Sequence, residues 1–215
     1  MLLNTQVGPT KSASTSQPPL RSGILGDAIV SELHGRFYEQ AFQGNLYSNG
    51  TTATALTANT ITLTATTTPI LGVWNPLSST SNLVILQAQL QLSPPVSAAA
   101  MGTLVWATSI NNAVISTGTA PFSRKTLTST GAQGKGMAFV ALTGLTNNLV
   151  IQFTSQLPAQ TLAGAATASA PYAGVENFDG SLIIPPGGVL ALLNTVSNTT
   201  MLAGGNLLWE EVPIS

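Results

Sequence analysis

In residues 82–92, with the sequence NLVILQAQLQL, apolar and polar side chains alternate from Leu86 onward, and this two-residue period is the strongest structural signal in the chain. Side chains on a β-strand point alternately to its two faces, so the segment predicts a half-buried strand. This period places Val84, Leu86, Ala88, Leu90 and Leu92 on one face, with Gln87, Gln89 and Gln91 on the other.

Similar strand signals recur along the chain, separated by residues that favour turns. From residue 27 onward, including FYEQAF at 37–42, the signals are those of strands and turns; the clearest lie at 52–68, 102–110, 136–145, 147–157, 180–198 and 206–215. No segment shows a capped amphipathic helix, and the many threonines, glycines and prolines oppose one. The sequence therefore predicts an all-β fold, an antiparallel jelly-roll β-sandwich of about eight strands.

Two turns are predicted near the C-terminal strands. In PPGG at 185–188, proline fixes φ near −65° and glycine accepts positive φ, which together favour a tight turn. Asp179-Gly180 predicts another tight turn, leading into the strand SLIIP. VLALLNTV at 189–196 predicts a strand buried on both faces, as expected where a neighbouring subunit covers the outer face of a sandwich.

The N-terminal residues differ in composition from the rest. Residues 1–22 are rich in Ser, Thr, Gln and Pro and have no periodicity, which is typical of an extended arm that is ordered only against a partner. The sequence predicts an extended N-terminal arm at 1–26 and a single jelly-roll domain at 27–215.

Charged residues are scarce, at 6% of the chain against a usual share of about 25%. None occurs between Gln40 and Ser123, and the net charge is −1. Such a surface suits packing against other subunits, because burying Thr or Asn costs less than burying a charge. The alternative is a Thr-rich β-protein with a neutral surface. Neither nucleic acid nor a membrane is an expected partner. Cysteine is absent, so the sequence predicts no disulfide and no thiolate metal site.

One charged cluster surrounds the only histidine. Glu32, His34 and Arg36 would share one face of a strand, with Glu39 nearby, so His34 could act as a general base held by Glu32. An ion-paired structural contact fits the same residues. The chain has no G-x-S-x-G nucleophile elbow, and one histidine without cysteine makes no ordinary zinc site. The structural interpretation is therefore preferred.

Three other features suggest ligands but lack the full pattern. Lys135, among the glycines of 129–137, is followed by glycine and precedes a strand, so it fails the phosphate-loop pattern; with Arg124 and Lys125 it predicts a basic loop tip. Glu176 and Asp179 are too few ligands for calcium. Trp74, Trp106 and Trp209 could stack on sugars, but their apolar contexts favour core or interface packing. We predict no enzyme activity and no catalytic, cofactor-binding or metal residues.

Three segments in order, HGRFYEQAFQGNLY, PILGVWNPLSSTSNLVILQAQLQL and LIIPPGGVLALL with GGNLLWEEVPI, resemble a family of tailed-phage virion proteins. The resemblance covers nearly all of residues 33–213. It implies a jelly-roll capsid decoration, or cement, protein that forms a homotrimer, binds the major capsid protein on the exterior of the phage head and stabilises it. It implies no catalytic residues. The expected location is the virion, assembled in the host cytoplasm; the alternative is a receptor-binding or glycan-binding domain of a tail fibre or baseplate.

Overall fold

The computed structural model describes residues 5–6, 20–21, 35–50, 56–58, 69–93, 104–110, 120–128, 137–139, 147–154, 172–194 and 198–214. The chain divides into two compact units, Met1–Tyr38 and Glu39–Ser215. In the first unit, β1 (Thr5–Gln6) pairs in parallel with β2 (Leu20–Arg21). The boundary predicted at residue 26 between arm and domain stays a prediction.

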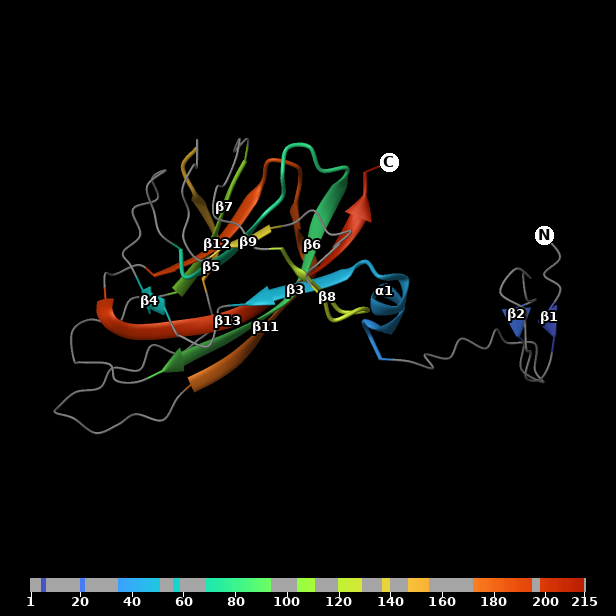
Figure 1. Ribbon diagram of the computed structural model, residues 1–215, viewed down its shortest axis with the longest axis horizontal. Helices are drawn as coiled ribbons and strands as arrows, with labels where there is room; N and C mark the ends of the chain where they lie inside the picture. Colours follow the sequence, from blue (N-terminus) through green and yellow to red (C-terminus); the bar gives the residue numbers. More distant parts are fainter. Residues whose placement is uncertain are drawn as a thin grey trace. The chain divides into compact units, whose positions relative to one another are not determined.

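The second unit consists mainly of antiparallel strands (Figure 1). The strands are β3 (Leu46–Gly50), β4 (Leu56–Ala58), β5 (Leu71–Trp74), β6 (Ser81–Ser93), β7 (Leu104–Ser109), β8 (Phe122–Ser123), β9 (Met137–Phe139), β10 (Val150–Thr154), β11 (Tyr172–Ile184), β12 (Val189–Asn194) and β13 (Asn198–Pro213). One sheet has the order β10-β7-β12-β5-β9, the other has the order β11-β6-β13-β3-β8, and β4 also pairs with β13. The prediction of an all-β fold is confirmed for the described residues.

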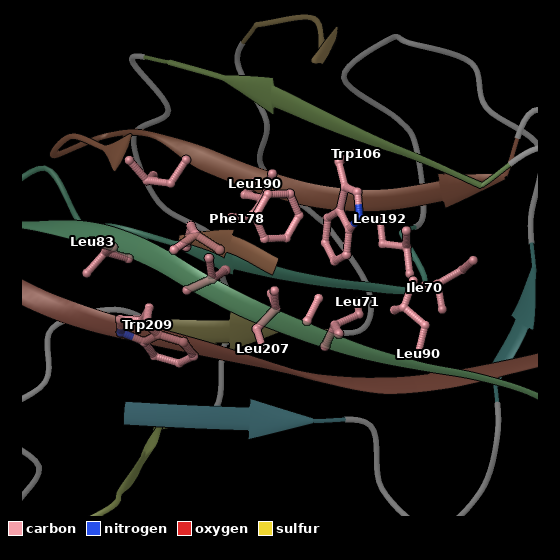
Figure 2. Close-up of a cluster of buried hydrophobic side chains, with 14 of the residues drawn as sticks. Ile70, Leu71, Leu83, Leu90, Trp106, Phe178, Leu190, Leu192, Leu207 and Trp209 are labelled. Atoms are coloured by element: carbon pink, nitrogen blue, oxygen red, sulfur yellow. The ribbon is translucent and has the colours of Figure 1, made fainter. Parts of the chain in front are cut away.

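The two sheets pack face to face through one hydrophobic core. Figure 2 shows side chains of the first sheet, such as Trp106 and Leu192, pointing toward Leu83, Leu207 and Trp209 of the second. Burying one large apolar side chain stabilises a fold by about 1.5–3 kcal/mol, so this shared core holds the two layers together.

Strand β12 is buried on both faces, as the sequence predicted. Leu190 and Leu192 face the core between the sheets. Val189, Ala191 and Leu193 belong to a second buried cluster with Trp74, Val105, Ala107 and Leu149. The expected reason for this burial was wrong, because a single chain already buries both faces without a neighbouring subunit.

The predicted inward face of β6 is correct only in its second half. Ala88 and Leu90 lie in the core, but Leu83 and Ile85 occupy it in place of the predicted Val84 and Leu86. On the neighbouring strand β13, Leu208 pairs with Gln87 and Trp209 with Ile85, so Leu86 is an extra residue. This β-bulge shifts the alternation by one position and reverses which residues face inward.

Two local predictions around turns need correction. Residues 37–42 were expected among the strands, whereas Tyr38–Gln43 forms the short helix α1, which ends at Gly44 with a φ of 86°. Asp179 and Gly180 do have positive φ, but they lie in a bulge within β11 rather than in a tight turn before a new strand.

The predicted PPGG turn is confirmed. The Gly188 amide donates to the Pro185 carbonyl oxygen at 2.8 Å, and Gly187 has a φ of 80°. This is the geometry of a type II turn, which requires positive φ at its third residue. The turn carries the chain from β11 in one sheet to β12 in the other.

Candidate interaction surfaces

The cluster proposed around the histidine is only partly visible. Glu32 and His34 lie outside the described residues. Arg36 is exposed in a turn rather than in the predicted strand, and its guanidinium carbon lies 5.2 Å from the centroid of the Phe37 ring. Glu39 follows within α1. The described residues therefore test neither the catalytic nor the structural interpretation of His34.

The three tryptophans are core residues, which rules them out as exposed platforms for sugars. Trp106 and Trp209 are fully buried, and Trp74 is nearly so. The Trp106 Nε1 donates a hydrogen bond of 2.5 Å to Glu176 Oε2, which joins the two sheets. The Trp106 and Phe178 rings also meet edge to face at 5.6 Å.

The other two candidate sites show no ligand geometry in the residues that the structure describes. Glu176 accepts the Trp106 hydrogen bond, and Asp179 lies in the β11 bulge. Within the described ranges, no group of three or more His, Asp or Glu side chains could hold a metal ion. Lys135 and its glycines lie outside those ranges, whereas Arg124 and Lys125 are exposed beside β8.

Sequence reasoning missed a buried acidic residue, Glu211, which is 7% exposed. Burial, followed by the charge of Glu211, raises the pKa of the buried Tyr47 hydroxyl above its usual value. Burial also raises the pKa of Glu210. The signal was present in the sequence, since Trp209 and Glu211 are two residues apart on one strand and so share a face.

The first exposed apolar surface lies where strands β10 and β11 form the matching edges of the two sheets. Every residue of β10 is exposed. The Phe153 ring on β10 meets the Phe178 ring on β11 at 5.8 Å, which connects the two edges. We define the edge surface by six exposed apolar residues: Ile110, Val150, Ile151, Phe153, Val175 and Ile183.

A groove of about 390 Å³ runs between these edges and the turn before β12. Val150 and Ile183 stand on its rim. Its polar lining is held by internal hydrogen bonds, from Gln152 Nε2 to Thr108 Oγ1 at 2.9 Å and from Asn147 Nδ2 to the Ile110 carbonyl oxygen at 2.6 Å. The groove is therefore shaped by the fold and lined by neutral groups.

The second surface lies around β8, which ends the β11-β6-β13-β3-β8 sheet on the side opposite to β11. We define this β8 surface by exposed Phe42, Phe122, Arg124, Lys125 and Leu127. The Lys125 Nζ lies 5.6 Å from the centroid of the Phe42 ring, a distance typical of a cation–π contact. This surface thus combines basic and aromatic side chains, which fits an acidic partner better than a basic one.

Leu127 on this surface is strained as well as exposed. Its φ is 57°, a conformation that costs a non-glycine residue about 1–2 kcal/mol, and its side chain is 73% exposed. The Leu127 amide donates to the Ser123 carbonyl oxygen at 2.9 Å, which closes the loop in this conformation. The strained backbone of Leu127 holds its apolar side chain in solvent, which does not stabilise the fold. We therefore infer that this side chain contacts another molecule.

We expect Leu127→Gly to raise the free energy of unfolding by up to about 1 kcal/mol, because glycine adopts positive φ without a Cβ clash. The matched control is Leu127→Ala, which removes the same apolar surface but keeps the clash. Thermal unfolding should show a melting temperature about 2–4 °C higher for the glycine variant alone. Equal melting temperatures for the two variants would contradict the strain.

Comparisons with protein-family models, curated proteins and solved structures found no match to this chain. In the part of the chain that the structure describes, no helix has the length and apolar character needed to cross a membrane.

Proposed function

We propose that this chain is a structural protein of a phage virion, a capsid decoration protein without enzymatic activity. The observation that carries the proposal is the presence of two separate exposed apolar surfaces on one charge-poor β-sandwich. A protein that joins other subunits needs at least two contact areas on a rigid body, whereas an enzyme needs convergent reactive groups.

The order of the strands supports a jelly roll. Eight strands taken in chain order, β3, β5, β6, β7, β10, β11, β12 and β13, pair first with last, second with seventh, third with sixth and fourth with fifth. This pairing is what results when one long hairpin is wrapped around a core, which is the plan of the jelly roll common in viral capsid proteins.

In this proposal, each surface has its own partner. Copies of the chain form a homotrimer, and the β8 surface of each copy contacts the major capsid protein on the exterior of the head. Leu127 supplies the apolar anchor, and Arg124 and Lys125 pair with acidic groups. The arm at residues 1–26 would reach neighbouring capsid subunits. Because a trimer presents every contact three times, weak contacts add up to firm attachment.

The groove favours one alternative, a glycan-binding domain of a tail fibre or baseplate. Asn147, Asn148 and Gln152 line it, and amide side chains are suitable partners for sugar hydroxyls. Against this alternative, all three tryptophans are buried, so none can stack on a sugar ring in the groove.

The location of the protein on intact particles tests the proposal. Gold-labelled antibodies against the chain, imaged on particles of the phage that encodes it, are expected to label heads. Heads that lack the protein should rebind wild-type protein, and should rebind Arg124→Glu/Lys125→Glu protein more weakly, with Gln89→Glu as a control that adds charge elsewhere. Label confined to tails would refute the decoration role and favour the glycan-binding alternative.

A further inference from the structure

We infer that the edge surface, made by β10 and β11, is where copies of this chain associate with one another. This inference rests on the proposed function, which includes a homotrimer, and assigns that contact to a specific side of the sandwich. It follows from three features of this side: strand edges without a neighbour among the described strands, exposed apolar residues and a small number of charges.

The two edges lie at matching ends of the sheets. Among the described strands, β10 and β11 each pair with one neighbour only, β7 and β6 respectively. Each edge therefore has a row of backbone amide and carbonyl groups without a partner among the described strands. Native proteins usually block such edges with charges, prolines or short strands, because an open edge promotes association. The described residues of β10, VIQFT, contain neither a charge nor a proline.

The apolar residues gather around the groove. Val150 is 60% exposed and Ile183 is 53% exposed, and both stand on its rim, as does Ile110. The same side thus carries projecting apolar side chains and a hollow with apolar walls. In a ring of three copies, each contact joins two different parts of neighbouring chains, so the projecting side chains of one copy can fill the hollow of the next.

The small number of charges on the edge surface indicates which kind of partner it would bind. No charged residue occurs from 136 to 175, and β11 carries two acidic residues: Glu176, which accepts the Trp106 hydrogen bond, and Asp179, which is exposed in the bulge. An ordinary protein surface would bring charges that lose water on this neutral surface without gaining a partner. Another copy of this chain has the same charge-poor surface and so avoids this cost. The β8 surface differs, because Arg124 and Lys125 give it charge.

The experiment measures association of the purified full-length protein by sedimentation equilibrium over a range of concentrations. The wild-type chain is expected to form trimers. Val150→Lys and Ile183→Lys place a charge on the rim of the groove and should each weaken the association constant by at least about tenfold. The matched control is Leu127→Lys, which adds the same charge at an exposed apolar residue of the β8 surface and should leave the trimer intact.

Each outcome decides a different question. A wild-type monomer at every concentration would overturn both the trimer and this inference. Trimers that persist in both rim variants, with an unchanged association constant, would overturn the inference and leave the proposed function standing. Dissociation by Leu127→Lys alone would move the contact to the β8 surface.

A second measurement does not depend on whether the variants fold. Hydrogen–deuterium exchange of the wild-type protein at low and high concentration should show slower exchange of β10 and β11 amides in the trimer. Exchange that changes elsewhere but not in these two strands would contradict the assignment.

Discussion

Replacing Trp106 with alanine is expected to lower the free energy of unfolding by about 3–5 kcal/mol. Trp106 is fully buried between the sheets, where its ring meets Phe178 edge to face and its Nε1 donates to Glu176. The substitution leaves a large cavity and removes the hydrogen bond that joins the two layers. Denaturant unfolding followed by circular dichroism would measure the loss, and a loss below about 1 kcal/mol would contradict this packing.

A comparison with Trp209 separates the hydrogen bond from the lost volume. Trp209 is equally buried, but its Nε1 has no hydrogen-bond partner among the described residues. Trp106→Phe and Trp209→Phe remove the same volume, but only the first leaves the partly buried Glu176 carboxylate without this donor. We expect Trp106→Phe to cost about 1–3 kcal/mol more than Trp209→Phe. Equal costs would show that the Glu176 contact contributes no stability.

Gly205→Ala is the second substitution expected to have a large effect. Gly205 faces Leu90 where β13 pairs with β6, in the middle of a sheet. A Cβ added at Gly205 would lie 2.3 Å from the backbone oxygen of Gln89, and backbone cannot move aside as a flexible side chain can. We expect a loss of about 1–3 kcal/mol or more, because β6 and β13 must separate locally.

The control for this substitution is Gly35→Ala, since a Cβ at Gly35 would meet nothing within 4 Å. Denaturant midpoints of the two variants give the comparison. A stable Gly205→Ala protein with a midpoint equal to that of Gly35→Ala would contradict the close approach of the two strands.

Several features could be predicted from the sequence because they depend on neighbouring residues only. The strand predicted at 102–110 is present as β7, and the apolar run at 189–194 correctly indicated burial on both faces. The PPGG turn followed from the backbone preferences of proline and glycine. The burial of Glu211 could have been predicted in the same way, from its spacing to Trp209.

Other features depended on contacts between residues far apart in the chain. Leu86 became an extra residue because β6 must pair with both β13 and β11, and the pattern of β6 alone does not reveal where its partners lose register. The position of β10 and β11 at the ends of the described sheets likewise depends on the order of strands in each sheet.

The sequence by itself determined that this chain forms strands, because side-chain alternation and turn preferences are local properties. Only the tertiary structure decided which apolar residues enter the core and which stay exposed. Val150 and Ile183 have the same apolar character as Leu190 and Leu192, yet the first pair lies on open edges and the second between the sheets. The physical reason is that burial depends on position in the sheet, which long-range pairing sets, and this position creates the edge surface.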